Sequence, residues 1–332
     1  MTANSLTTVQ AARALEAVGL TGAAAQVLAV VPLAGGVSNQ TDLVTTRDGD
    51  FVVRRPPPGP RHGNAHDMAR EHEMLVLASA ATPLAPKPFG YESNDVVIGS
   101  PFLVMERKGG VPLARGLLEG MSPDDRGKLC VAFARLLATL HRAPVHASVT
   151  AVNPSGYVAR QIEGWTRRAE LLGVGDDVNP VLSWLRGEAA CARSEEPRFL
   201  HNDFKFDNLL VDATDSTRPT ALLDWELSTV GDPLMDLGCA LAYWVQADDP
   251  AELRAIKRGN TDLNGMLRRH ELVAEYVRSG GTDPGSRLAF YETFGRVRLA
   301  LIAFQVARQK ADDQFAEAGQ VMLTAAEQVL AL

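Results

Sequence analysis

The polar residues between His201 and Asn208, together with Asp224, have types and spacing that could carry out phosphoryl-transfer chemistry. The segment reads HNDFKFDN, and Asp224 stands at the end of an apolar stretch, LLDWE. Transfer of a phosphoryl group to a hydroxyl needs a carboxylate that orients and deprotonates the hydroxyl, and oxygen ligands that hold Mg²⁺ against nucleotide phosphates. We predict that Asp203 is the catalytic base and that Asn208 and Asp224 are the metal ligands.

Two regions of different character must position these residues. After one short helix, the first half carries β-branched runs separated by glycine and proline, which predicts a small antiparallel sheet with the strands VLAVVPL, TDLVTT, DFVVRR, DVVIG and PFLVME. Residues 65–79 lack glycine and proline and space apolar residues at helical intervals, so we expect one helix packed on that sheet. The proline-rich segment RRPPPGPRHG should be a surface loop.

From Ser122 onward the sequence is typical of helices. SPDD provides an N-cap with an acid three residues later, and the periodic stretch KLCVAFARLLATLH follows. Two short strands, within RFLHNDFKFDNLLVD and TALLDWE, interrupt the helices once, and breaks are expected near Gly280 and Pro284. The glycines of RKGGV are suited to a hinge, which divides the chain into lobes of residues 1–106 and 107–332.

Composition excludes several classes of protein. Of the 332 residues, 46% are hydrophobic and 22% are charged, as is usual for soluble globular proteins. The net charge of -7 argues against nucleic acid as a partner, and no apolar run is long enough to span a membrane, so we expect a cytoplasmic protein. The three cysteines are far apart and are expected to be reduced and packed. The sequence lacks G-x-S-x-G, G-x-x-x-x-G-K-[ST] and a G-x-G-x-x-G after the first strand, which argues against a hydrolase or a dehydrogenase.

Three motifs, in this order and spacing, resemble the aminoglycoside phosphotransferase family, relatives of choline and homoserine kinases and more distantly of protein kinases. HNDFKFDN resembles the catalytic loop, LLDWE the metal-binding I-D-W-[DE], and STVGDPLMDLG the G-D-P-x-x-D-L stretch. The resemblance covers nearly the whole chain. It implies an α+β, protein-kinase-like, two-lobed fold, with an N-terminal antiparallel sheet and one helix, and a larger, mainly helical C-terminal lobe. It also implies an ATP- and Mg²⁺-dependent phosphotransferase that acts on a hydroxyl of a small molecule.

The same resemblance assigns nucleotide binding to the N-terminal lobe. LAGGVSNQTDLVTT resembles the nucleotide-covering loop, although a bare hairpin turn would look the same, and it contains Gly35, Gly36, Ser38 and Asn39. DFVVRR stands where kinases have V-A-I-K, so either Arg54 or Arg55 replaces the lysine; the register favours Arg54, with Glu71 as partner. Adenine would meet backbone groups of Met105, Glu106 and Arg107, and side chains that could pack on its ring are Val53, Val104 and Leu210.

Further polar residues lie within or just after these motifs. Lys205 stands where many protein kinases have a lysine that steadies the transferring phosphoryl group, but it could equally be a solvated loop lysine. His201 is expected to brace the loop, and Asp207 either faces the substrate or caps the loop. Asp232 and Asp236 are expected to hold the turn and helix start beneath the site.

The motifs do not define the acceptor. A polycationic aminoglycoside would require an acidic pocket, but the available acids usually form solvated helix faces: Glu163, Asp248, Asp249, Glu252, Asp312 and Asp313. FVVRRPPPGP, AHDMARE and QIEGWTRRAE resemble the phosphotransferase branch that is also found fused to acyl-CoA dehydrogenases. That branch points to a hydroxylated acyl compound or its CoA thioester. The alternative is a catalytically inactive pseudokinase that serves as a nucleotide-binding module, because an arginine replaces the lysine.

Overall fold

The computed structural model describes residues 5–22, 26–33, 39–57, 67–113, 115–145, 156–192 and 196–330. The chain divides into two compact units, of which the first contains Met1–Gly110 and Thr220–Leu227, and the second contains Val111–Pro219 and Ser228–Leu332. The lobe boundary that the sequence predicts at residue 106 would place Thr220–Leu227 in the second lobe, whereas these residues belong to the first unit. The assignment of nucleotide binding to residues 1–106 and of catalysis to residues 107–332 stays a prediction.

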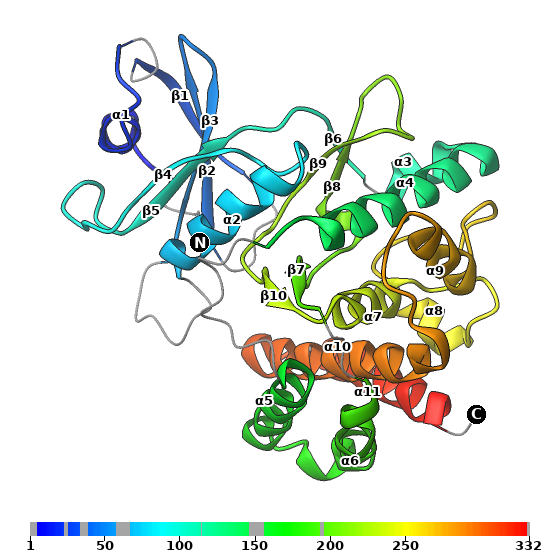
Figure 1. The fold of residues 1–332 in the computed structure, drawn as a ribbon. Helices are drawn as coiled ribbons and strands as arrows, with labels where there is room; N and C mark the ends of the chain where they lie inside the picture. Colours follow the sequence, from blue (N-terminus) through cyan, green and yellow to red (C-terminus); the bar gives the residue numbers. More distant parts are fainter. Residues whose placement is uncertain are drawn as a thin grey trace. The chain divides into compact units, whose positions relative to one another are not determined.

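The first unit is built on a five-stranded antiparallel sheet with the order β1-β2-β3-β5-β4 (Figure 1). Its elements are α1 (Thr8–Ala17), β1 (Val27–Pro32), β2 (Gln40–Thr46), β3 (Asp50–Arg55), α2 (Met68–Ala81), β4 (Pro88–Glu92) and β5 (Phe102–Glu106). Helix α1 buries Leu15 in one hydrophobic core with Val53 and Val104 of the sheet. This core covers one face of the sheet.

One predicted strand is wrong. DVVIG, residues 95–99, forms a turn in which the Gly99 N–H donates to the Asp95 carbonyl and the Val96 N–H donates to Asn94 Oδ1. The fifth strand is instead β4, with the sequence PFGYE, which pairs with β5. Asparagine and aspartate favour turns by bonding to the backbone two residues on, and this local chemistry outweighs the β-branched run.

Helix α2 lies two to three residues later than residues 65–79, the range that the sequence predicts, because it starts at a side-chain cap. The carboxylate of Asp67 accepts from the Arg70 N–H and satisfies one of the free donors at the helix start. Residues 58–66, which include most of the proline-rich segment and the start of the predicted helix, lie outside the described residues.

The second unit is mainly helical, as predicted (Figure 1). Strand β6 pairs with β8, and β7 pairs with β10. The helix breaks expected near Gly280 and Pro284 fall between α9 and α10. Strand β9 (Pro219–Leu222) falls almost entirely in the segment that belongs to the first unit. The elements of the second unit are β6 (Val111–Pro112), α3 (Arg115–Gly120), α4 (Pro123–Arg142), α5 (Tyr157–Leu172), α6 (Gly175–Ala192), β7 (Arg198–Leu200), η4 (Phe206–Asn208), β8 (Leu209–Val211), β10 (Thr229–Gly231), α7 (Pro233–Tyr243), α8 (Ala251–Ala255), α9 (Arg269–Arg278), η5 (Gly285–Arg287), α10 (Leu288–Lys310) and α11 (Asp313–Leu330).

Helix α10 approaches α7 so closely that glycine is needed on both helices. A Cβ added at Gly238 would lie 2.1 Å from the carbonyl oxygen of Tyr291, and one added at Gly295 would lie 2.2 Å from the carbonyl oxygen of Gly238. Real Cβ atoms do not come so near to backbone oxygens. The two glycines therefore set the depth at which α10 packs beneath the functional residues described below.

Two simpler expectations concern the whole chain. Of the three cysteines expected to be reduced and packed, Cys130 and Cys239 are free and buried, and the side chain of Cys191 lies outside what the structure describes. In the part of the chain that the structure describes, none of the helices is both long and apolar enough to cross a membrane.

Candidate active site

Two buried phenylalanines hold the segment HNDFKFDN in place. Phe204 and Phe206 pack on Phe133 of α4 at ring-centroid distances of 4.4 and 4.9 Å, and Phe206 packs on Trp244 at 5.1 Å. Lys205 between them has an extended backbone, in which neighbouring side chains point to opposite sides. Burial of both rings therefore turns Lys205 away from the core.

The carboxylate of Asp203, the predicted base, is fixed at both oxygens. Lys205 Nζ lies 2.6 Å from Oδ2, to which Asn208 Nδ2 also donates at 3.1 Å. The hydroxyl of Tyr243 donates to Oδ1 at 2.9 Å. Burial alone would raise the pKa of Asp203, but the charges of Lys205 and Arg298 outweigh it and hold this pKa below its ordinary value. Asp203 is thus ionised at neutral pH.

The start of the loop is anchored on Asp236, which is fully buried in α7. Its carboxylate accepts from the N–H groups of His201 at 2.7 Å and Asn202 at 2.9 Å, and it lies 3.1 Å from Nε2 of His141. Asn202 has a positive φ of 63°, a conformation that non-glycine residues rarely adopt. The two bonds to Asp236 hold this backbone directly beside Asp203.

His201 and Asp232 have the structural positions that the sequence predicts for them. Nδ1 of the fully buried His201 accepts from the Asp203 N–H at 3.2 Å, so the imidazole braces the loop. Asp232 caps α7 by accepting from the Leu234 N–H at 2.9 Å, and it also accepts from the Tyr291 hydroxyl at 3.0 Å. Asp207 lies 3.9 Å from Arg258, a long ion pair at a partly exposed position.

Asn208 and Asp224 offer oxygen atoms to a cation in different ways. Asn208 is buried and donates its amide nitrogen to the Asp203 carbonyl at 2.8 Å, so its amide oxygen is the atom with which it could hold Mg²⁺. Asp224 has a half-buried carboxylate and a positive φ of 68°. It belongs to the first unit and Asn208 to the second. Among the described residues no group of three or more His, Cys, Asp or Glu side chains could hold a metal ion, and a site shared by these two stays a prediction.

In the first unit, one arginine contacts three carboxylates. Nε of Arg54 lies 3.1 Å from Glu71 of α2, and Nη2 lies 3.2 Å from Asp224 and 2.6 Å from Glu226. Arg55, on the opposite side of the strand, pairs with Asp42 at 3.4 Å. Of the two arginines that the sequence left open, Arg54 is therefore the one that faces Glu71.

The imbalance of charge in this cluster changes the acidity of Glu71. Burial raises the pKa of the Glu71 carboxyl to about 7. The charge of Arg54 lowers this pKa, but Arg54 is shared with Glu226 and Asp224, whose negative charges raise it. Burial would lower the pKa of Arg54, but the three carboxylates raise it above its ordinary value. The guanidinium thus stays charged while Glu71 titrates near neutral pH.

The predicted nucleotide-covering loop is described only at its end. Gly35, Gly36 and Ser38 lie outside the described residues. Asn39 is buried, and its Nδ2 donates to Glu226 Oε2 at 3.1 Å. Its side chain therefore contacts the same carboxylate as Arg54.

The adenine contacts predicted around β5 need one correction. Met105 pairs with Val52 across the sheet, and Arg107 lies 3.8 Å from Asp50. The Glu106 N–H donates to the Lys87 carbonyl at 2.8 Å, so this donor is already occupied. Val53 and Val104 are wrong as ring contacts because they are fully buried in the core beneath α1. Since successive strand residues face opposite sides, it is Val52 that shares the face of Arg54.

A small pocket lies beside Lys205 in the second unit. Its polar lining comes from Lys205, Asp207, Tyr243, Arg258 and Thr261, and aromatic walls come from Phe133, Phe206 and Trp244. The pocket thus joins apolar surface to the polar groups of the catalytic loop.

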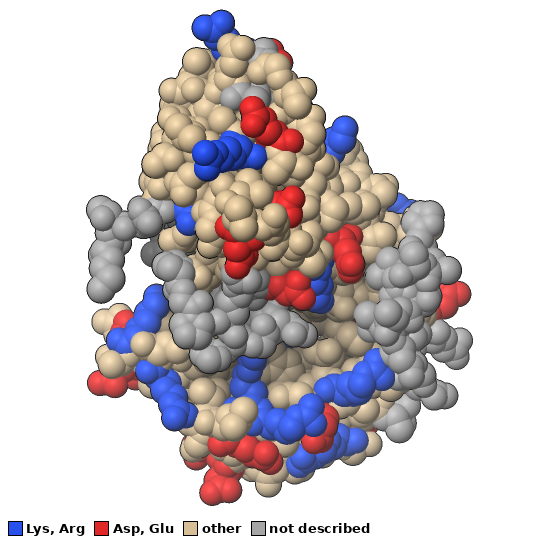
Figure 2. Space-filling model, turned by 90° about the vertical axis from the view of Figure 1, so that its left-hand side faces the viewer, with Lys and Arg blue, Asp and Glu red and all other residues tan. Residues whose placement is uncertain are grey.

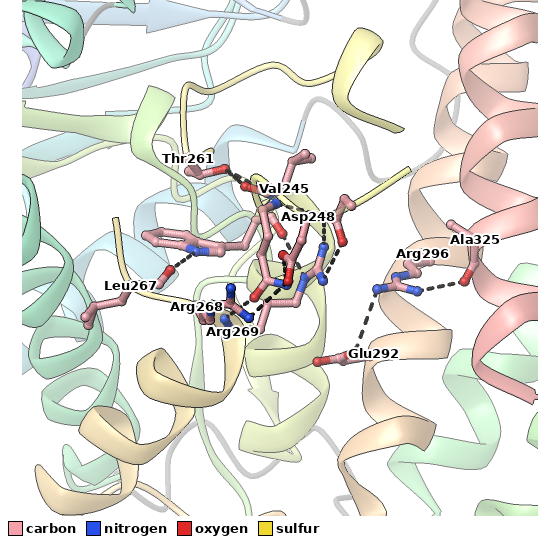
Figure 3. Close-up of polar contacts among 12 residues, drawn as sticks. Val245, Asp248, Thr261, Leu267, Arg268, Arg269, Glu292, Arg296 and Ala325 are labelled. Atoms are coloured by element: carbon pink, nitrogen blue, oxygen red, sulfur yellow. Dashed lines mark hydrogen bonds and ion pairs between the residues drawn. The ribbon is translucent and has the colours of Figure 1, made fainter. Parts of the chain in front are cut away.

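A polar network fixes the segment from Trp244 to Arg269, which forms one wall of this pocket (Figure 3). The Thr261 hydroxyl accepts from the Val245 N–H at 2.9 Å and donates to the Val245 carbonyl at 2.8 Å. The Trp244 indole donates to the Leu267 carbonyl at 2.8 Å, and Arg269 pairs with Asp249. The wall is therefore held at both ends of the segment.

Comparison with known proteins decides the family. A sequence model of the phosphotransferase enzyme family (APH) matches residues 29–272, more than half of the chain. The chain belongs to this family. It is also 30% identical over 312 residues to rat (Rattus norvegicus) acyl-CoA dehydrogenase family member 11, a match that covers 89% of this chain and 39% of the rat protein. The chain thus spans about two fifths of that relative's length.

Solved structures agree with this assignment. A candidate aminoglycoside phosphotransferase from Ralstonia eutropha is 25% identical and matches with a TM-score of 0.73, covering 97% of each chain. Choline kinase from Cryptosporidium parvum is 14% identical and matches with a TM-score of 0.61, covering 91% of this chain and 88% of its own. The second likeness shows the fold alone. The kinase-like fold that the motifs predict for this phosphotransferase is confirmed.

Sequence reasoning missed three residues around the site of this phosphotransferase. Glu226 could have been found from its place two residues after Asp224, on a segment that returns to the sheet. Tyr243 and Arg298 stand in helices α7 and α10, far along the chain from Asp203, and only the packing of these helices brings them near it. No short-range pattern signals such contacts.

Proposed function

We propose that this phosphotransferase uses ATP and Mg²⁺ to phosphorylate a hydroxyl group of a small molecule. The observation that carries the proposal is the buried, ionised carboxylate of Asp203, held by Lys205 and Tyr243 next to a pocket with aromatic walls. Membership of the phosphotransferase family supports the reaction type. ATP as donor is supported by the solved streptomycin–ATP complex of APH(2″)-IIa, a structure of the same fold.

The second unit would carry the chemistry. Asp203 would accept a hydrogen bond from the acceptor hydroxyl and take its proton, and Lys205 would leave Asp203 to contact the transferring phosphoryl group. Asn208 and Asp224 would hold Mg²⁺, which when bound neutralises charge on the nucleotide phosphates. Tyr243 would keep Asp203 oriented while Lys205 moves.

The first unit would bind the nucleotide. Arg54, oriented by Glu71 and Glu226, would contact the phosphates, and the loop with Gly35, Gly36, Ser38 and Asn39 would cover them. Backbone groups from Met105 to Arg107 would meet the adenine, except the Glu106 N–H, which is already bonded within the sheet. These assignments follow the motif resemblance and the contacts of Arg54.

For the acceptor, we favour a hydroxylated acyl compound or its CoA thioester over an aminoglycoside-like compound. Three of the acids considered for a polycation site are already bound to arginines: Glu163 to Arg167 at 3.3 Å, Asp248 to Arg268 at 3.0 Å, and Asp249 to Arg269. Acids neutralised in this way offer little attraction to a cation. The name of the rat relative also supports an acyl metabolite.

The test is ATP consumption by the purified protein with Mg²⁺ and a panel of hydroxyacyl-CoA compounds, hydroxy acids, aminoglycosides, choline, homoserine and sugars. Asp203→Asn should bind ATP normally and lose turnover by about 100- to 10,000-fold. Equal rates in both proteins would refute the role of Asp203. ATP binding without consumption on any acceptor would favour the inactive, nucleotide-binding alternative.

A further inference from the structure

A buried arginine beside the catalytic loop lacks a carboxylate of its own. Arg298 on α10 is 7% exposed, and its Nη1 has no hydrogen-bond partner in the structure. Its electrostatic neighbours are the thiol of Cys239, the hydroxyl of Tyr243 and, more weakly, the carboxylate of Asp203. Within the described residues it forms no ion pair. Burial would lower the pKa of Arg298, but Cys239, Tyr243 and Asp203 raise it above its ordinary value, so the guanidinium stays charged while its Nη1 donor has no partner. A buried donor without a partner is costly, so we expect Nη1 to have a use.

Arg298 and a second arginine, Arg168, both lie over the ring of Trp165 in α5. The guanidinium carbon of Arg298 lies 5.7 Å from the ring centroid of Trp165, and that of the exposed Arg168 lies 4.7 Å from it. Arg168 also forms no ion pair among the described residues. Burial lowers the pKa of Arg168, and the charge of Arg298 lowers it further, as expected for like charges close together.

Neither guanidinium on the Trp165 ring is neutralised by an ion pair among the described residues. Asp203, the carboxylate that acts on Arg298, already has Lys205 Nζ at 2.6 Å and cannot fully neutralise Arg298 as well. Figure 2 views the molecule from the side on which α5 lies in Figure 1, and it shows Lys and Arg side chains gathered across the lower part of that face. Helix α5 contributes Arg160 and Arg168 to this face, whereas its Arg167 is paired with Glu163. This surface would attract anions.

We propose that Arg298 and Arg168, which meet at Trp165, bind an anionic group of the acceptor, so that the substrate is an alcohol carrying a carboxylate or a phosphate. The inference rests on the proposed function, since the acceptor hydroxyl must reach Asp203. Arg298 is within electrostatic reach of both Asp203 and Tyr243, so it can hold one end of a molecule whose hydroxyl lies at the base.

The chemistry of guanidinium favours this ligand. Arginine presents several donors in a planar fork that matches a carboxylate or phosphate, and charge-assisted bonds of this kind contribute about 1.5–3 kcal/mol each. That range corresponds to about 10- to 100-fold in affinity. An uncharged alcohol of the same length would leave the Nη1 donor unsatisfied.

Binding measured without turnover tests the inference separately from the reaction. Calorimetric titrations would compare ω-hydroxy acids of three to eight carbons with the diols of the same lengths, and would include inorganic phosphate. The proteins are wild type, Arg168→Gln, Arg298→Lys and the control Arg167→Gln. Arg167 neighbours Arg168 but is exposed and paired with Glu163 at 3.3 Å. Arg298→Lys keeps the buried charge, in case a neutral residue there prevents folding.

We expect at least one acid to bind wild type and Arg167→Gln about tenfold tighter than its diol, and phosphate to compete with it. Arg168→Gln and Arg298→Lys should lose most of that preference while binding ATP as wild type does. Equal binding of acids and diols, or no binding of any acid and of phosphate, would overturn the inference. Weaker ATP binding in Arg168→Gln with unchanged acid binding would assign the arginines to the nucleotide and would overturn it as well.

The two proposals fail in different ways. Acid-selective binding without ATP consumption would keep the anion site and remove the phosphotransferase function. ATP consumption that is as fast with diols as with acids, and equal in wild type and Arg168→Gln, would keep the function and remove the anion site.

Discussion

Glu226 Oε2 lies 2.6 Å from Arg54 Nη2, which is closer than either of the other two carboxylates that this guanidinium contacts. The arginine stands where kinases have a lysine, and its planar fork reaches Glu71 through one nitrogen and Glu226 through another. A lysine, with a single ammonium nitrogen, could not keep both contacts in this geometry. Glu226 is thus the partner that distinguishes this arginine from the usual lysine.

A double-mutant cycle tests this partnership. Arg54→Lys should weaken ATP binding about tenfold, an effect of the size expected for losing one charge-assisted bond. In a Glu226→Gln background the same change should cost clearly less, because the contact is already weakened. Arg55→Lys, which changes an arginine paired with Asp42, is the control and should leave ATP binding unchanged. Additive effects of Arg54→Lys and Glu226→Gln would show that the two residues act independently.

The pKa of Glu71, raised to about 7 by burial, makes stability depend on pH. Between about pH 4.5 and 7 the folded protein keeps a proton on Glu71 that the unfolded chain has lost. The folded state binds more protons there, so the free energy of unfolding should fall as pH rises, by up to about 3 kcal/mol. Glu71→Gln should lack this component. Urea unfolding of both proteins from pH 4.5 to 8 measures it, and parallel curves would contradict the shift.

Removal of the Tyr243 hydroxyl should alter the acidity of the base. Tyr243→Phe deletes the donor to Asp203 Oδ1, so the carboxylate is less stabilised and the pKa of Asp203 should rise. The acid limb of the kcat/KM profile should move up by about one pH unit, with ATP affinity unchanged. Tyr291→Phe removes a similar hydroxyl from Asp232 and should leave the profile in place. Identical acid limbs in Tyr243→Phe and wild type would disprove the coupling.

The close approach of α7 and α10 predicts a large cost for one methyl group. In Gly295→Ala the new Cβ would meet the Gly238 carbonyl at 2.2 Å, and backbone cannot yield as a flexible side chain can. We expect a loss of about 3 kcal/mol in unfolding free energy. Gly187→Ala in α6 has open space around the new Cβ and should instead stabilise by about 0.5–1 kcal/mol. Thermal unfolding compares the two, and equal melting temperatures would contradict this account of the packing.

The sequence is most informative where the relevant contacts are local. HNDFKFDN folds as one loop because Phe204 and Phe206 alternate with Lys205. The resemblance of DFVVRR to V-A-I-K, with strand alternation and helix phase, predicts that Arg54 meets Glu71. The errors have equally physical origins. Val53 could have been rejected from strand alternation alone, since it neighbours Arg54 and must face the other way. In DVVIG, turn formation by Asn94 and Asp95 outweighed the β-propensity of the valines.

The rest of the site depends on contacts between distant segments. Tyr243 and Arg298 reach the catalytic loop because Gly238 and Gly295 let two helices touch, and nothing near either residue in the sequence indicates this. The functional assignments of Asp203, Lys205, Asn208 and Asp224 stay predictions that the experiments above address.

The membership of Thr220–Leu227 in the first unit has a practical consequence for dissecting the protein. A fragment cut after Gly110 would retain Arg54 and Glu71 but lose Asp224 and Glu226, and with them the shortest ion pair of its charged cluster. A stand-alone version of this unit would need the missing segment supplied in trans as a peptide, or spliced next to it in a permuted gene. Gene fusions or truncations that separate the sequence after Gly110 would therefore divide a compact unit.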